Sequence, residues 1–343
     1  MEQMKMTLKI AKIHKTWVFR LLLVVVPFFG YYFTQDMFLQ SQISSHDKVL
    51  CERKYTAKKL NALEANFTIN TQLFLKLEDF FWRKFPYGLA LPYGVNGSEP
   101  VLLKVLAFIA KYEMPEQIQR LTCRTCAVIG NGFTMKNSSL GDTINKYDLV
   151  IRLNDAPIRG FEQDVGNKTT IRLFYPESAS TKSVDENNPD TLMVLVPFKR
   201  IDISWLKELL YDEKRVTKGF WKPVPQVWVG NVGQIRILHP HYLIETAVKL
   251  LKIPLKLPPK SKQKPVHPTT GILAVLMALN YCDVVHIAGF GYPKTADHKV
   301  PIHYYGSNTM KSMKDSFHDL TKEALALRKL EEVGAIQYLH PHS

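Results

Sequence analysis

Apolar runs that end in glycine or polar residues recur through the middle of the chain. The first, at 127–132, reads AVIGNG and passes directly into a Gly-x-Gly turn. Two more follow, at 147–153 and 169–175, and they end in Asn154 and Pro176. Short apolar runs bounded by turn residues are typical of buried strands. Strands that end in polar residues at a regular spacing predict an open α/β sheet that binds its ligands at the strand ends.

The same reading predicts further strands and the helices between them. Strands are expected at 192–196, 234–239 and within 282–291. A spacing of three to four residues between apolar positions predicts helices, at 73–85, 99–112, 204–211, 241–251, 272–280 and 320–330. The loop at 254–268 is rich in lysine and proline, and two interpretations stay open: a mobile lid over an anion site, or a solvated linker.

The N-terminal part predicts a membrane anchor. Residues 17–33 are apolar apart from Arg20, although the uninterrupted apolar part is shorter than the roughly 20 residues of a usual span. A cleaved signal peptide is the alternative. Aromatic residues at the end of the segment favour a retained anchor, and the preceding basic residues favour a cytoplasmic tail. We therefore expect a tail at 1–16, an anchor at 17–33, a partly helical stem at 34–70 and a globular domain at 71–343.

Charge and cysteine content limit the partners and the compartment. The net charge is +14 over 343 residues, which suits an anionic ligand, a membrane or nucleic acid, but equally a basic surface without a specific partner. Nucleic-acid binding rests on charge alone and is not favoured. The four cysteines suggest two disulfides in a secretory chain, with three possible pairings. Zinc is not expected, because Cys123-x-x-Cys126 has no second ligand pair at the usual spacing.

Three short patterns are candidates for ligand binding. The turn around Asn131 could bind a nucleotide through its backbone or be only a tight turn, since Met135 stands where a dinucleotide motif has its third glycine. Thr269, Thr270 and Gly271 begin an apolar helix, where free N–H groups form an anion site or a plain N-cap. A second Gly-x-Gly, at residues 289–291, ends a predicted strand.

At these residues the chain resembles a known family. The run CAVIGNGFTMKNSSLGDTINKYDLVIRLNDAPIRGFEQDVGNKTTIRLFYPE, at 126–177, resembles the large sialylmotif of the eukaryotic sialyltransferases. Residues 268–291 resemble the small motif, and 301–305 the third motif, with Gly306 in place of its usual acid. The stretch 318–323 resembles the very small motif, His-x4-Glu. The likeness extends from about residue 51 to the C-terminus and looks closest to the α2,3-sialyltransferases of the N-acetyllactosamine type.

The resemblance implies a fold, a reaction and a cellular location. The fold would be a single Rossmann-like variant of the GT-A glycosyltransferase domain, with a mostly parallel sheet flanked by helices. The reaction would be inverting transfer of sialic acid from CMP-sialic acid to the 3-hydroxyl of a terminal galactose on a glycoprotein or glycolipid. The chain would be a type II Golgi membrane protein with a lumenal catalytic domain. The resemblance also implies the disulfides Cys126–Cys282 and Cys51–Cys123.

Roles for individual residues follow from the matched motifs. His318 would be the base that takes the galactose proton, with Glu323 either orienting its ring or only beginning a helix. His303 and the Thr270–Gly271 helix start would stabilise the phosphate of the departing CMP. The remaining expected donor contacts are Asn131, Asn154, Thr269, Gly289, Gly291 and His267. No cofactor is expected, and the absence of any Asp-x-Asp pair predicts a metal-independent reaction.

The sequence leaves other functions and acceptors open and contains possible glycosylation sites. One alternative is a catalytically inactive Golgi protein that binds sialic acid or nucleotide, and another is a soluble NAD-dependent enzyme. Transfer to Galβ1-3GalNAc or to lactosylceramide stays open beside Galβ1-4GlcNAc. Sequons for N-glycosylation, which agree with a lumenal address, begin at Asn66, Asn96, Asn137 and Asn167.

Overall fold

The computed structural model describes most of the chain beyond residue 50. It describes residues 27, 30–31, 51–63, 67, 69–80, 88–180, 186–256, 265–293, 299–313 and 316–340. The chain divides into two units, Met1–Val49 and Leu50–Ser343. The expected tail, most of the expected anchor, the sequon residue Asn66 and the middle of the lysine-rich loop lie outside the described residues. Within the described ranges, no helix has the length and apolar character needed to cross a bilayer.

The second unit is organised around one parallel sheet of seven strands, in the order β5-β4-β3-β2-β1-β6-β7. Every neighbouring pair is parallel. The strands are β1 Thr125–Ile129, β2 Leu149–Leu153, β3 Ile171–Phe174, β4 Leu192–Leu195, β5 Ile235–Ile237, β6 Val284–Ala288 and β7 Gln337–Tyr338. The strand order reverses between β1 and β6, and ligands of open α/β sheets bind at the carboxyl ends of strands beside such a reversal.

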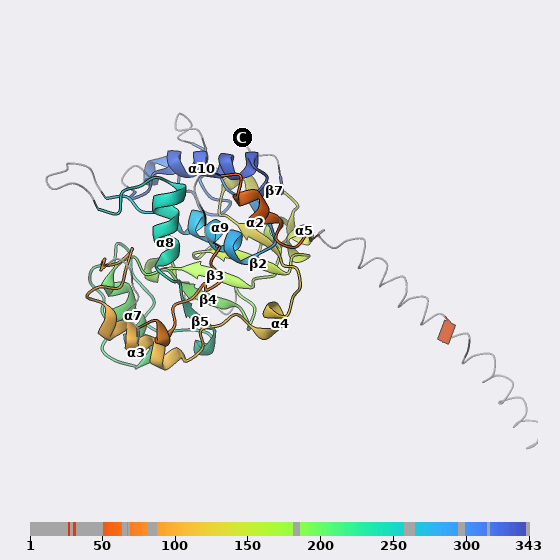
Figure 1. The fold of residues 1–343 in the computed structure, drawn as a ribbon. Helices are drawn as coiled ribbons and strands as arrows, with labels where there is room; N and C mark the ends of the chain where they lie inside the picture. Colours follow the sequence, from red (N-terminus) through yellow and green to blue (C-terminus); the bar gives the residue numbers. More distant parts are fainter. Residues whose placement is uncertain are drawn as a thin grey trace, which may run out of the picture. The chain divides into compact units, whose positions relative to one another are not determined.

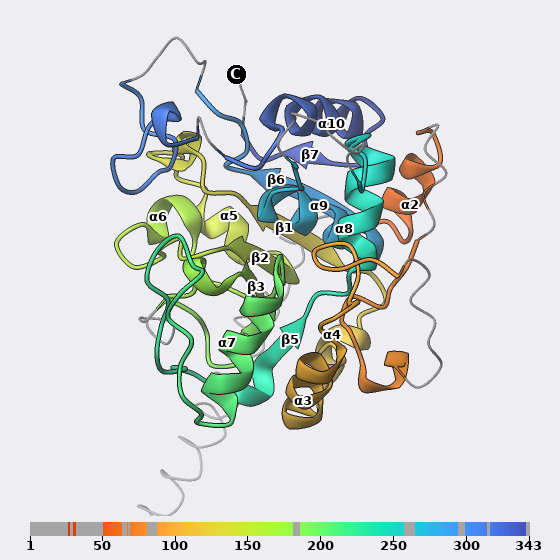
Figure 2. The ribbon, with the colours of Figure 1, turned by 90° about the vertical axis from the view of Figure 1, so that its left-hand side faces the viewer.

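Helices cover both faces of the sheet (Figures 1 and 2). They are α2 Tyr55–Leu60, α3 Glu99–Ile109, α4 Glu116–Gln119, α5 Gly141–Asn145, α6 Glu162–Val165, α7 Arg200–Leu210, α8 His241–Glu245, α9 Thr270–Tyr281 and α10 Leu320–Glu332. A one-turn π-helix, Thr246–Leu250, continues α8. One core cluster joins α2, α8, α9 and α10 to one face, and a second joins α3 and α7 to the other face at β3, β4 and β5.

The helix that matters most for the site is α9. It is apolar on nearly all sides and almost wholly buried, as expected for a helix enclosed by other elements. Its N-cap is Thr269, whose hydroxyl accepts a hydrogen bond from the N–H of Ile272 at 3.2 Å. Asp319 caps α10 in the same way through the N–H of Lys322. Both helix starts are therefore fixed by side chains next to candidate site residues.

One predicted helix is wrong over its described part. Residues 73–76 are extended: Phe74 forms an antiparallel bridge with Leu238, and the N–H of Leu75 donates to the carbonyl of Ile237. Only a short 3-10 turn, Leu77–Phe80, follows. Phe74 and both of its neighbours are buried beside the end of β5, so this apolar run belongs to an extended segment enclosed on both sides and not to one face of a helix.

The segment expected to form the end of the stem belongs to the folded unit. Helix α2 lies within 34–70, yet the unit begins at Leu50. Thr56 donates to the carbonyl of Asp283 at 2.9 Å through both its N–H and its hydroxyl, and Leu60 is buried in the core. Helix and core contacts thus begin ahead of the expected boundary at residue 70.

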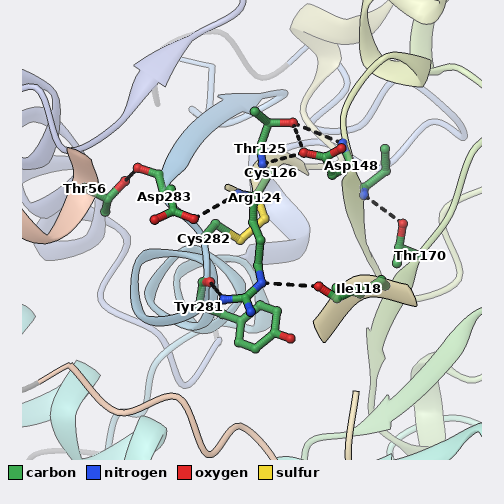
Figure 3. The surroundings of a disulfide bond; sticks show 11 residues. Thr56, Ile118, Arg124, Thr125, Cys126, Asp148, Thr170, Tyr281, Cys282 and Asp283 are labelled. Atoms are coloured by element: carbon green, nitrogen blue, oxygen red, sulfur yellow. Dashed lines mark hydrogen bonds between the residues drawn. A yellow bond between two sulfur atoms is a disulfide. The ribbon is translucent and has the colours of Figure 1, made fainter. Parts of the chain in front are cut away.

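Both expected disulfides are present. Cys126 pairs with Cys282 and Cys51 with Cys123. Figure 3 shows that Cys126–Cys282 links the start of β1 to the end of α9, beside the carboxylate of Asp283. That carboxylate accepts from the backbone N–H of Arg124 at 2.9 Å. The two disulfides therefore join the segment around Cys51, the start of β1 and the end of α9 at the amino-terminal ends of the strands.

Candidate active site

Three glycines let the ends of β1 and β6 approach closely. A Cβ on Gly130 would lie 2.3 Å from the carbonyl oxygen of Gly289, and one on Gly132 would lie 2.6 Å from the same atom. Gly289 itself has φ +69, which favours glycine. These glycines are thus required by contact between two backbone turns. At Gly291, by contrast, a Cβ would meet open space.

The third motif lies against the turn that follows β1. His303 forms an antiparallel bridge with Gly132, and the N–H of Tyr304 donates to the carbonyl of Asn131 at 3.0 Å. The Asn131 amide donates to the hydroxyl of Tyr305 at 3.3 Å. The His303 ring stacks on the ring of Tyr305, with centroids 5.2 Å apart. The structure therefore brings together His303 and Asn131, which are far apart in the sequence.

Asn154 joins the end of β2 to the start of α9. Its backbone is left-handed, with φ +56, a conformation that asparagine adopts more readily than most residues. Its N–H donates to the carbonyl of Leu173 at 2.7 Å. Its side-chain oxygen lies 3.3 Å from the hydroxyl of Thr270. Asn154 and Thr270 are thus neighbours, as expected for two parts of one site.

A buried arginine that the sequence analysis did not single out supports this turn. Arg172, in β3, is 2% exposed. Its guanidinium donates to the carbonyl oxygens of Asn154 at 2.9 Å and Ala156 at 3.0 Å. It also donates to Glu186 and Asn187. A charged residue inside an apolar strand run was the signal that could have identified it.

Glu323 binds the start of α9. One carboxylate oxygen accepts from the N–H of Thr269 at 2.8 Å, and the other accepts from the Thr269 hydroxyl at 2.7 Å. Burial raises the pKa of Glu323 to about 7, the hydrogen bonds from Thr269 oppose the shift, and Asp319 adds to it. Among the described residues, its hydrogen bonds therefore fix Thr269, and neither is made to the ring of His318.

His318 is buried and has one ring nitrogen engaged. Its Nδ1 lies 2.9 Å from the carbonyl oxygen of His267. A carbonyl oxygen can only accept, so the hydrogen lies on Nδ1 and Nε2 carries a lone pair in the neutral ring. Burial lowers the pKa of His318, while the hydrogen bond to His267 opposes the shift. The neutral form of His318, which a base requires, is therefore favoured chiefly by burial.

The ring of His267 lies among other rings. It packs edge-on against the ring of His318, with centroids 4.8 Å apart. The ring of Phe198 lies on it at a tilt of 31°, with centroids 4.6 Å apart. Burial first, and then the charge of His318, lower the pKa of His267 to about 4. This ring is therefore neutral at physiological pH, so any contact with a donor phosphate there would come from a dipole and not from a full charge.

His303 differs from the other two histidines because the charge of a carboxylate acts on its ring. Burial lowers the pKa of His303, and the charge of Asp155 raises it. Asp155 also lines a small cleft at the sheet edge, together with Asn154, Arg172, Ser178 and Glu186. A histidine with a nearby carboxylate can become positively charged when an anion approaches, which is the property needed beside a phosphate.

The candidate residues fall into three linked groups at the carboxyl edge of the sheet. Asn131, His303 and Gly289 lie at the ends of β1 and β6, and Asn154 joins Thr270 at the start of α9. His318, His267 and Glu323 lie at the junction of α9 and α10. In the described ranges, no hydrogen bond links His318 directly to His303.

The other sequence candidates lie outside these groups. Asn96, Asn137 and Asn167 are exposed. Gly306, where the family has an acid, has φ +68 and no atom within 4 Å of an added Cβ. The described residues hold one cluster with metal-ligand atoms, Cys51, Cys123 and Asp283. Its two sulfur atoms form a disulfide and offer no thiolate.

A parallel sheet with a strand-order reversal, glycine turns and a helix start at one edge is the arrangement of an open α/β protein that binds its ligand at that edge. The sequence profile of glycosyltransferase family 29 (sialyltransferase) matches residues 37–335. The chain belongs to this family and is therefore a glycosyltransferase.

Comparisons with individual proteins agree with membership of this family. The chain is 53% identical over 289 residues to the human CMP-N-acetylneuraminate-beta-galactosamide-alpha-2,3-sialyltransferase 4, covering 84% of this chain and 86% of that protein. It is 42% identical over 241 residues to the mouse type 2 lactosamine alpha-2,3-sialyltransferase, covering 70% and 72%. A crystal structure of a mammalian sialyltransferase in complex with Gal-beta-1-3GalNAc-ortho-nitrophenol matches with a TM-score of 0.63 and 25% identity, covering 85% of this chain and 98% of that one.

Proposed function

We propose that the protein transfers sialic acid from CMP-sialic acid to the 3-hydroxyl of a terminal galactose, with inversion at the sialic acid carbon. The names of the two relatives above support the donor and the α2,3 linkage. Galβ1-4GlcNAc on glycoproteins or glycolipids is the proposed acceptor, because a type 2 lactosamine enzyme is among these relatives. The fold is then a Rossmann-like variant of the GT-A domain.

The observation that carries the proposal is the hydrogen bond between Nδ1 of His318 and the carbonyl of His267, from which the tautomer of His318 follows. A galactose hydroxyl is a weak nucleophile, so its proton must leave as the new bond forms. The free lone pair on Nε2 of His318 accepts that proton, while the carbonyl of His267 keeps the ring oriented through Nδ1. The lowered pKa keeps the ring neutral and able to act at pH 7. Glu323 supports the site by fixing Thr269 at the start of α9.

The leaving CMP gains negative charge on its phosphate. The first N–H groups of α9, at Thr270 and Gly271, stabilise that charge through unpaired donors and the helix dipole. His303 assists from beside the turn that follows β1. Burial lowers its pKa and Asp155 opposes that shift, and an approaching phosphate adds to the effect of Asp155 in favouring the protonated ring. Asn131 and Asn154 contribute amides for the ribose and phosphate. The donor carries one phosphate, and these groups neutralise it without a metal ion.

The proposed place of action is the Golgi lumen. Residues 17–33 anchor the chain, with residues 1–16 in the cytoplasm, and the folded unit faces the lumen. Two disulfides in the folded unit support this address, because disulfides form in the secretory pathway and are rare in the cytosol.

The test compares wild type with His318→Asn and His318→Ala. Purified full-length protein is incubated with CMP-sialic acid and Galβ1-4GlcNAc, with and without EDTA, and both CMP release and product linkage are measured. We expect an α2,3-linked product, no effect of EDTA, and a loss of kcat of about 10²–10⁴-fold in both variants. The amide introduced by His318→Asn can still donate to the carbonyl of His267 but offers no base, so CMP binding should persist.

The pH profile provides a second readout. Because the pKa of His318 is lowered, wild-type kcat/KM should stay level as the pH falls to about 6.5, the usual histidine pKa, and decline only below it. Acceptor-independent CMP release with no transfer would indicate a different function. Normal turnover by both variants would place the base elsewhere.

A further inference from the structure

One large aromatic side chain near the site is exposed without an evident structural role. Trp221, between α7 and β5, is 69% exposed, whereas Trp205 in α7 is 1% exposed. The indole is large and apolar, and leaving it in water forfeits the stabilisation that burial of an aromatic ring normally provides. An exposed tryptophan is ordinary on a mobile surface, so the way in which this one is fixed decides its meaning.

The backbone around Trp221 is bound by an ion pair between a buried carboxylate and a half-exposed lysine. Lys199 lies 2.7 Å from Glu177, a carboxylate that is 1% exposed. The same ammonium donates to the carbonyl of Gly219 at 3.0 Å, and the N–H of Trp221 donates to Glu177 at 3.4 Å. Burying a carboxylate is costly, and its pairing with a half-exposed lysine adds little net stability. Stability alone therefore does not explain why this ion pair binds both Gly219 and Trp221, at the two ends of a short turn.

A second ion pair places the indole beside the site. Lys222 lies 3.1 Å from the carboxylate of Asp155, and its ammonium lies 5.4 Å from the centre of the Trp221 ring. Asp155 follows Asn154 and lines the cleft at the end of β2, and its charge acts on His303. Strand ends β2, β3 and β4 thus all contribute residues that hold Trp221 next to the cleft.

We propose that Trp221 is a platform for a sugar of the acceptor glycan, the one that follows the terminal galactose. The inference rests on the proposed function. One face of a hexose carries C–H groups that can cover an indole, while its hydroxyls point sideways to polar partners such as Lys222. The reacting galactose must lie against His318 at the junction of α9 and α10. The turn that carries Trp221 is linked to this junction through Lys199, because its neighbour Phe198 packs on the ring of His267 beside His318. The indole makes no contact with His318 among the described residues, and we therefore assign it to the next sugar.

The test uses two acceptors and three variants of the full chain. Galβ1-4GlcNAc contains the second sugar, and methyl β-galactoside lacks it. Trp221→Ala should raise the KM for the disaccharide about tenfold, the loss expected when one face of an indole is no longer covered. The KM values for methyl β-galactoside and for CMP-sialic acid should not change. Trp221→Phe should restore most of the disaccharide affinity, because it keeps an aromatic face.

A matched control and a binding measurement separate the possible failures. Val227→Ala, at a side chain that is 67% exposed in the same segment, should leave all constants unchanged. Calorimetric titration with the disaccharide reports binding even if no transfer occurs. A wild type that binds the disaccharide but forms no product would overturn the proposed function alone. Equal disaccharide constants for wild type and Trp221→Ala, or an equal loss with both acceptors, would overturn the role of Trp221 alone.

Discussion

The contact between Glu323 and Thr269 gives a prediction whose size can be worked out. Glu323 is 7% exposed, and burial raises its pKa from 4.5 to about 7. The folded state therefore binds the proton more tightly than the unfolded state does. The stability contributed by this group is greatest below pH 4.5 and declines as the pH rises towards 7. Replacing Glu323 with glutamine removes the titration but keeps a side chain of the same size.

The magnitude follows from the two pKa values. For a group that titrates at 4.5 when unfolded and at about 7 when folded, the free energy of unfolding falls by about 2 kcal/mol between pH 5.5 and pH 8. Wild type should show this fall on top of the pH dependence shared with Glu323→Gln. Glu323→Ala should in addition lose stability at both pH values, because the N–H of Thr269 is left without its acceptor, at a cost of about 1–3 kcal/mol.

Urea unfolding of the purified full chain, followed by tryptophan fluorescence at pH 5.5 and pH 8, measures these differences. The decisive quantity is the stability of wild type minus that of Glu323→Gln at each pH. If this difference is the same at both pH values, the carboxyl does not titrate in the folded state near pH 7 and the reasoning is refuted. A larger difference at pH 8 than at pH 5.5 would reverse the sign and refute it equally.

Two further predictions concern the framework of the site. Replacing both Cys126 and Cys282 with alanine removes a cross-link across 156 residues and should lower the free energy of unfolding by about 2–5 kcal/mol, visible as a lower melting temperature; an unchanged melting temperature would contradict this. Arg172→Met should raise the KM for CMP-sialic acid more than that for the acceptor, because the carbonyl of Asn154 loses its donor. Arg172→Lys should not restore it, since one ammonium cannot replace the guanidinium fork, and full recovery would count against the role.

Local patterns predicted the framework well. The apolar runs predicted six of the seven strands, including β1, β2 and β3, because a buried strand needs a short apolar run and a turn at its end. They missed the short strand β7. Helix α3 was predicted to within a few residues, and it ends at Ala110 in a left-handed conformation. The family resemblance supplied both disulfide pairings, which the spacing of the cysteines left open.

The hydrogen-bond partners of buried polar groups could not be predicted from local sequence patterns. Sequence analysis offered two roles for Glu323, and the tertiary structure gave a third, binding Thr269 from another helix. The turn of Gly130 and Gly132 was left open as a nucleotide contact or a tight turn, and the structure shows that both glycines are needed for contact with Gly289. Sequence analysis passed over Arg172 and Trp221. In each case the partner lies on a distant segment, and the pattern of one segment says nothing about what packs against it.

The sequence by itself determined the parallel sheet, the turns at its carboxyl edge and the family, because strand periodicity, glycine turns and motif order are properties of neighbouring residues. Only the tertiary structure decided that residues 73–76 are extended beside β5 and that the proton of His318 lies on Nδ1. Those outcomes depend on which carbonyls, carboxylates and apolar surfaces come together when segments more than 50 residues apart pack around one core.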